Sequence, residues 1–138
     1  MSRFNAAQRR YNRAALLLSV AYALILFGVI TFFRNSTPAG ASAYAAAILP
    51  ALPIIGIFAA MGRYLVDEKD EYVRMLMVRQ TLWASGFALS VATIWGFLEN
   101  FDLVRHVDAY YVAVLWFGGL GLGACINKLT LGAAAEPC

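Results

Sequence analysis

Four long uncharged stretches constrain this chain more than any other feature of its sequence. Each is about as long as the ~20 apolar residues that a helix needs to cross a hydrocarbon layer of about 30 Å. Only helices and closed barrels satisfy the backbone in lipid, and these stretches are continuous rather than alternating. The sequence therefore predicts an all-α integral membrane four-helix bundle, a single domain over residues 1–138. The uncharged stretches are 14–33, 41–62, 80–98 and 109–127, and the expected helices are 14–33, 41–62, 68–98 and 109–128.

The basic residues predict how the helices are oriented. Short loops on the cytoplasmic side of a membrane carry an excess of Lys and Arg. Nine of the eleven fall in segments 1–13, 63–79 and 128–138, whereas only Arg34 and Arg105 fall in the other loops. Both termini and residues 63–79 are therefore expected in the cytoplasm. The net charge of +3 therefore indicates contact of the basic residues with the lipid bilayer. It does not indicate binding of nucleic acid.

The loop before the third expected helix holds four of the eight acids of the chain. Asp67 is expected to be the N-cap of that helix, with Asp70 at its third position as in a capping box. Asp70 and Arg74 have the i,i+4 spacing of a helical ion pair. A helix over 68–98 is longer than the hydrocarbon layer is thick, so its first turns should protrude. The predicted partner-binding residues are Asp67, Glu68, Asp70, Glu71 and Arg74.

Small residues predict where helices pack closely. In lipid, helices associate through such residues rather than through hydrophobic expulsion. The fourth-helix glycines pack either within the chain or against a second copy in a homodimer, and both alternatives stand. The predicted packing residues are Ala84, Ala88, Ala92, Gly96, Gly119 and Gly123.

Pro50 and Pro53 predict a kink in the second helix, because each removes a backbone donor and crowds the preceding turn. Broken helices mark binding sites in some transporters. No polar side chain lies near these prolines in the sequence, which favours a role in packing.

The chemistry that is missing argues against an enzyme. The four stretches contain no Asp, Glu, Lys, Arg or His, although ion-coupled carriers usually keep such a group in the membrane. Small multidrug-resistance transporters have a defining acid in the first helix, and residues 14–33 contain none. We therefore predict no catalytic residue and no cofactor. A metal site in the loop with Glu99, Asp102, His106 and Asp108 is not predicted either, because the chain has one histidine.

The two cysteines, Cys125 and Cys138, lie toward the end expected in the cytoplasm. That compartment is reducing. The sequence therefore argues against a structural disulfide.

The run Val66-Asp67-Glu68-Lys69-Asp70-Glu71 leads directly into an apolar stretch. It resembles a loop of small bacterial four-helix membrane proteins, in which an Asp-Glu-Arg/Lys-Asp-Glu type segment precedes the third helix. The resemblance covers about residues 63–98 and implies this fold and a bacterial inner-membrane location. Some small membrane proteins of this kind are associated with cytoplasmic transcription regulators.

Two functions follow as hypotheses. The first is a non-enzymatic interaction or regulatory subunit that presents residues 63–79 to a cytoplasmic protein or a membrane complex. The second is a small channel or transporter for a neutral or apolar solute, built on the kink at Pro50 and Pro53.

Overall fold

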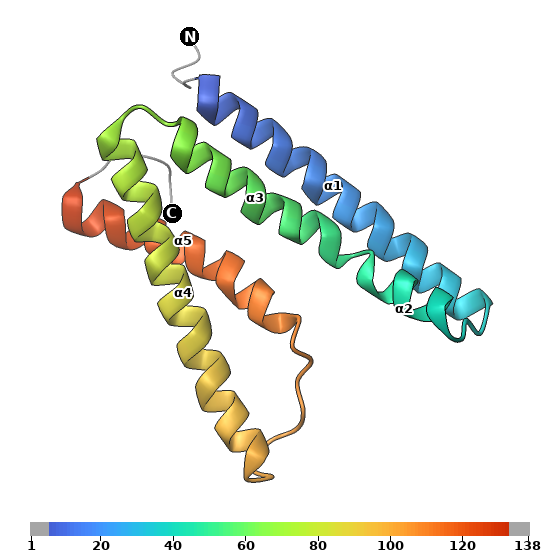
Figure 1. Cartoon of the computed structure of the whole chain (residues 1–138). Helices are drawn as coiled ribbons and strands as arrows, with labels where there is room; N and C mark the ends of the chain where they lie inside the picture. Colours follow the sequence, from blue (N-terminus) through green and yellow to red (C-terminus); the bar gives the residue numbers. More distant parts are fainter. Residues whose placement is uncertain (1–5, 133–138) are drawn as a thin grey trace. The chain divides into compact units, whose positions relative to one another are not determined.

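A computed structural model describes residues 6–132 of the chain, and every regular element in that range is a helix. The helices are α1 (Ala6–Asn35), α2 (Ala41–Ile48), α3 (Ala51–Asp67), α4 (Glu71–Asn100) and α5 (Tyr111–Leu131) (Figure 1). With α2 and α3 counted as one interrupted segment, four helices are long and apolar enough to cross a membrane. The predicted all-α class is confirmed for the described residues, and four helices have the length and apolarity that crossing a membrane requires.

The chain forms two compact units, Met1–Lys69 and Asp70–Cys138. The first holds α1, α2 and α3, and the second holds α4 and α5.

In the first unit, α1 packs antiparallel against α3 (Figure 1). The turn between α1 and α2 ends at Gly40, whose φ of 64° is in the left-handed region that glycine adopts without strain. Gly56 lets Leu18 approach, because a Cβ at this glycine would lie 3.1 Å from the leucine Cδ2. Ile57 and Met61 continue the buried face of α3.

The second expected helix, 41–62, is interrupted at Pro50, between α2 and α3. Pro50 is the N-cap residue of α3, and the turn that contains it is closed by the Leu52 amide donating to the Leu49 carbonyl at 3.2 Å. Pro53 is the third residue of α3, where amide groups have no intrahelical partner and a missing donor costs nothing. The break therefore belongs to Pro50 rather than to both prolines.

In the second unit, α4 and α5 are in backbone contact. A Cβ added at Gly119 would lie 2.8 Å from the Ala84 Cα, and one at Gly123 would lie 2.6 Å from the Gln80 carbonyl oxygen. Ala84 and Ala88 have almost no exposed surface. Close approach of this kind is how helices associate in lipid.

Four side-chain hydrogen bonds also join α4 to α5. Trp116 Nε1 donates to Ser85 Oγ at 3.0 Å, and Arg79 Nη2 donates to Thr130 Oγ1 at 3.0 Å. Gln80 Nε2 donates to the Leu120 carbonyl at 2.9 Å, and Asn127 Nδ2 donates to the Leu76 carbonyl at 2.9 Å. Polar side chains of the apolar stretches thus serve helix packing.

The helices extend beyond the lengths that apolar stretches predict. The first begins by Ala6 instead of residue 14, and the second continues to Asp67 instead of ending at residue 62. Apolar length measures the part of a helix that suits hydrocarbon, while arginines and tyrosines continue the same helix without breaking it.

Candidate functional site

The acidic segment contains one helix end and one helix start. Asp67 is the last residue of α3, and Glu68 is extended, with ψ 121°. Asp70 is the N-cap of α4, where its Oδ1 accepts from the Tyr72 amide at 2.9 Å and the Val73 amide at 3.3 Å. The prediction that Asp67 caps the third helix is therefore wrong, because α3 does not end until Asp67 and the next helix starts only after the linker.

The expected Asp70–Arg74 pair is replaced by another. Arg74 forms its ion pair with Glu71, one helical turn before it. The physical reason is that one Asp70 oxygen is already held by two amides of the first turn. The Glu71 side chain is 81% exposed, and exposed pairs of this kind contribute about 0–1 kcal/mol.

Asp67 and Glu68 lie in different surroundings from those expected. Asp67 pairs with Arg10 of α1 across 3.7 Å, a contact that spacing along the chain does not reveal. Glu68 is buried, with 3% of its surface exposed, so it does not belong to an exposed surface. The five predicted partner-binding residues thus divide between the two units.

The first turns of α4 have two distinct faces. Val73, Leu76 and Met77 are half-buried, and the Leu76 carbonyl contacts α5 through Asn127. Tyr72, Met75 and Val78 are 50%, 45% and 40% exposed, and their three-residue spacing places them along one side of the helix. We name Asp70, Glu71, Tyr72, Met75 and Val78 the α4 exposed face.

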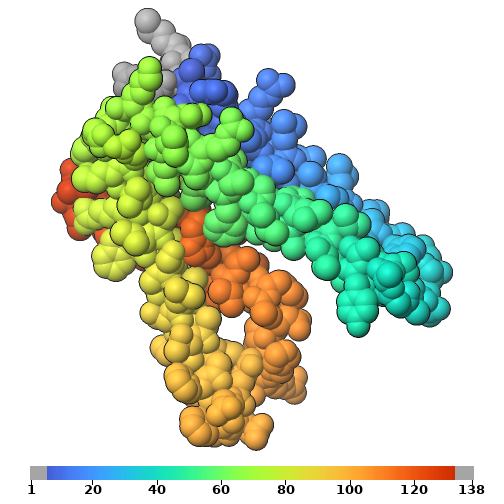
Figure 2. Space-filling view, viewed as in Figure 1, coloured from blue at the N-terminus to red at the C-terminus, as the bar shows by residue number. Residues whose placement is uncertain are grey.

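The small-residue stripe on α4 has two halves. Ala84 and Ala88 are buried, whereas Gly96 is exposed and a Cβ there would meet nothing within 4 Å. Ala92 and Gly96 instead line an open cavity of about 340 Å³ together with Trp95 and Tyr111. Figure 2 shows the opening between this end of α4 and the start of α5.

The loop at residues 101–110 is held by one acid. Glu99 Oε1 accepts from the Val107 amide at 2.7 Å, and its Oε2 lies 3.3 Å from His106 Nδ1. Within residues 6–132, no group of three or more His, Cys, Asp and Glu side chains could hold a metal ion. Glu99 therefore has a structural role in fixing the loop on α4.

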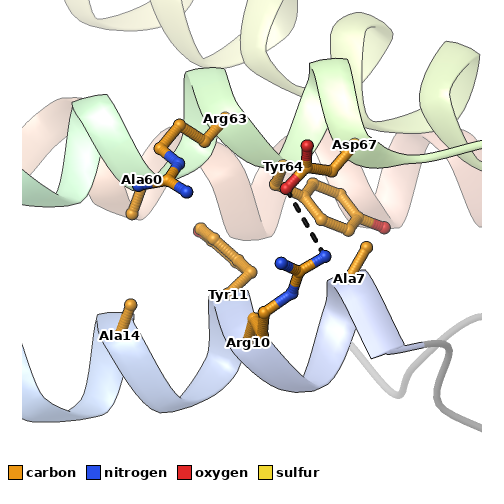
Figure 3. Close-up of a pocket in the computed structure, with 8 residues that line it drawn as sticks. All are labelled: Ala7, Arg10, Tyr11, Ala14, Ala60, Arg63, Tyr64 and Asp67. Atoms are coloured by element: carbon orange, nitrogen blue, oxygen red, sulfur yellow. Dashed lines mark ion pairs between the residues drawn. The ribbon is translucent and has the colours of Figure 1, made fainter.

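A cleft in the first unit is not evident from the sequence. It is lined by side chains from α1 and α3, and Figure 3 shows Arg10 of α1 directed toward Asp67 while Arg63 extends from α3 away from Asp67. Its residues on α1 and α3 are far apart along the chain. Antiparallel packing brings them together, because the start of α1 lies beside the end of α3. We name it the basic cleft, and it is lined by Ala7, Arg10, Tyr11, Ala14, Ala60, Arg63, Tyr64 and Asp67.

A second cavity of the first unit lies beside the helix break. It measures about 500 Å³, is widely open and reaches Leu49. Gly28, Phe32 and Ser42 belong to its lining, which is almost wholly apolar.

The expectation that the chain has no structural disulfide involves both cysteines, Cys125 and Cys138. Cys138 lies outside the described residues, so this expectation stays a prediction.

Comparison with protein-family models, with curated proteins and with solved structures gave no match to this chain.

Proposed function

We propose that this chain is a non-enzymatic integral membrane protein that acts as an interaction or regulatory subunit. It lies in a bacterial inner membrane with both termini in the cytoplasm and presents residues 63–79 to a cytoplasmic protein or a membrane complex. The observation that carries the proposal is the α4 exposed face, where Tyr72, Met75 and Val78 are exposed ahead of the apolar stretch 80–98.

Exposed apolar side chains in water favour a binding partner. Removing apolar surface from water is favourable by roughly 25 cal/mol per Å². Three apolar side chains on one side of a helix match the pattern by which a helix docks in an apolar groove. Met75 can adapt its flexible side chain to such a groove, and Asp70 and Glu71 add polar contacts at its edge.

The polar residues nearby have structural roles, which supports a function without chemistry. Asp70 caps α4, and Glu71 pairs with Arg74. Neither of these arrangements places a nucleophile beside a base, as covalent catalysis requires.

Site-specific photo-crosslinking tests the proposal in cells. A photoreactive residue at Met75 should give one discrete adduct, which disappears when Tyr72 and Val78 are both changed to Ser. The matched control is Leu103, which is also apolar and is 69% exposed but lies in the loop at the other end of α4. Adducts at Leu103 that equal those at Met75, or an adduct that survives the double change, would discard the α4 exposed face as the binding surface.

A second experiment separates the acids from the apolar residues. Changing Asp70 and Glu71 to Ser should reduce recovery of the crosslinked partner in a pull-down, while Ser at position 70 still caps α4. Unchanged recovery would assign binding to the apolar residues alone.

The alternative function is a small channel or transporter for a neutral or apolar solute. One observation favours it, the apolar cavity beside the break at Pro50. Flux of small apolar solutes into liposomes that contain the purified chain is the direct assay. Flux that Gly28→Leu abolishes would support this function over the first, because leucine would fill part of the cavity.

A further inference from the structure

The basic cleft brings two arginines from two helices to one cavity. Arg10 comes from α1 and Arg63 from α3, and the cavity between them measures about 240 Å³ (Figure 3). Tyr11 and Tyr64 pack against each other at 5.2 Å between ring centroids. Because Ala14 and Ala60 are small, the cavity stays open between the helices.

The charges at the cleft favour an anion. Arg10 is paired with Asp67, whereas Arg63 forms no ion pair with any residue in the described range 6–132. Arg9 and Arg13 lie with Arg10 around a shallow depression on the same part of α1. A guanidinium group presents several donors in one plane and matches the oxygens of a phosphate.

The position of the cleft selects the source of the phosphate. Arg13 immediately precedes the apolar stretch 14–33, and Arg63 immediately follows the stretch 41–62. The cleft thus lies where both helices pass from polar to apolar residues. Basic pockets between membrane helices on the cytoplasmic side are suited to anionic headgroups.

We propose that the basic cleft binds the phosphate headgroup of an anionic phospholipid from the cytoplasmic leaflet. Arg63 and Arg10 contact the phosphate oxygens, and the small residues Ala14 and Ala60 give the start of the acyl chains a path along the helices. The orientation that this requires is the one proposed above, but the cleft does not depend on the α4 exposed face.

Native mass spectrometry of the detergent-solubilised full chain tests this inference. The chain is titrated with phosphatidylglycerol and, separately, with phosphatidylcholine of the same acyl chains. We expect preferential retention of phosphatidylglycerol. Since each basic group near an anionic headgroup contributes about a fivefold effect, Arg63→Gln should weaken this binding about fivefold and the Arg10→Gln, Arg63→Gln double variant about 30-fold.

Arg9→Gln is the matched control, because it removes the same charge from the same helix but does not line the cleft. It should change phosphatidylglycerol binding less than twofold, and Arg63→Lys should retain most of it. Circular dichroism checks that each variant is helical, and the single Arg63→Gln variant decides if the double variant does not fold.

Three results would overturn the proposal. Equal retention of phosphatidylcholine would show that the cleft does not select lipids by the charge of the headgroup. A loss with Arg9→Gln as large as that with Arg63→Gln would indicate diffuse attraction by the basic arm. Displacement of phosphatidylglycerol by an equal concentration of inorganic phosphate would identify free phosphate as the ligand.

Discussion

At the scale of single residues, Gly121 and Gly123 lie two positions apart on α5 in different surroundings. A Cβ at Gly123 would lie 2.6 Å from a backbone oxygen of α4, whereas one at Gly121 would meet nothing within 4 Å. Gly123→Ala should therefore destabilise the α4–α5 pair by about 1–3 kcal/mol through overpacking. Gly121→Ala should be neutral or stabilise the helix by up to about 1 kcal/mol. Unfolding in mixed micelles, followed by circular dichroism, measures both changes, and equal effects of the two would contradict this packing.

The same glycines show how far a residue pattern reaches. The four-residue spacing of Gly119 and Gly123 predicts which side of α5 is closely packed. It does not predict which helix packs against that side. The contacts of Gly119 with Ala84 and of Gly123 with Gln80 favour packing within the chain over a second copy. Ala92 and Gly96 continue the spacing of Ala84 and still line a cavity, because helices that cross are close only over part of their length.

At the scale of elements, the start of α4 depends on one side chain. Asp70 accepts from two amides of the first turn, and loss of such a cap costs about 1 kcal/mol. Asp70→Ala should therefore increase hydrogen exchange of the amides of Tyr72 and Val73, while Asp70→Ser should leave it near the native rate. Glu71→Ala removes only an exposed ion pair and serves as the control. Equal protection in Asp70→Ala and the native chain would show that the cap does not stabilise this turn.

The break between α2 and α3 separates the roles of two prolines. Pro50→Ala restores a backbone donor at the break, so α2 and α3 should join into one straighter helix. Spin labels at Ser42 and Arg63 should then lie farther apart and show a narrower distance distribution. Pro53→Ala should leave that distance unchanged, because Pro53 lies in the first turn of α3. A larger change with Pro53→Ala would assign the break to the other proline.

The helix ends were harder to predict than the helices themselves. Asp67 and Asp70 are both suitable N-caps by residue type, and nothing local distinguishes them. Which of the two caps the next helix depends on how far α3 continues. The last turns of α3 are held on α1, because Tyr64 contacts Tyr11 and Asp67 pairs with Arg10. These contacts join residues more than 50 positions apart, which a local pattern does not encode.

At the scale of the whole molecule, the distribution of Lys and Arg predicts the orientation in the membrane. With Cys125 and Cys138 replaced by Ser, a single cysteine at Ser36 should react with an impermeant reagent in intact cells, and one at Lys69 should not. Lysed cells provide the control, in which both positions should react. Labelling at Lys69 alone would indicate the inverted orientation. Equal labelling at both positions in intact cells would indicate insertion in two orientations and revive the transporter alternative.

The pairing of α1 with α3 and of α4 with α5 has a consequence for biosynthesis. The first pair joins α1 to the interrupted segment of α2 and α3, and the second joins α4 to α5, so each pair forms between consecutive spans at a small entropic cost of loop closure. Because α1 and α3 are both complete by Asp67, this first pair can form while the ribosome is still adding the residues of α4. The second pair then needs only the residues after Lys69. We expect the protein to fold as it is made, one hairpin after the other, with the acids at 67–71 emerging between the two steps.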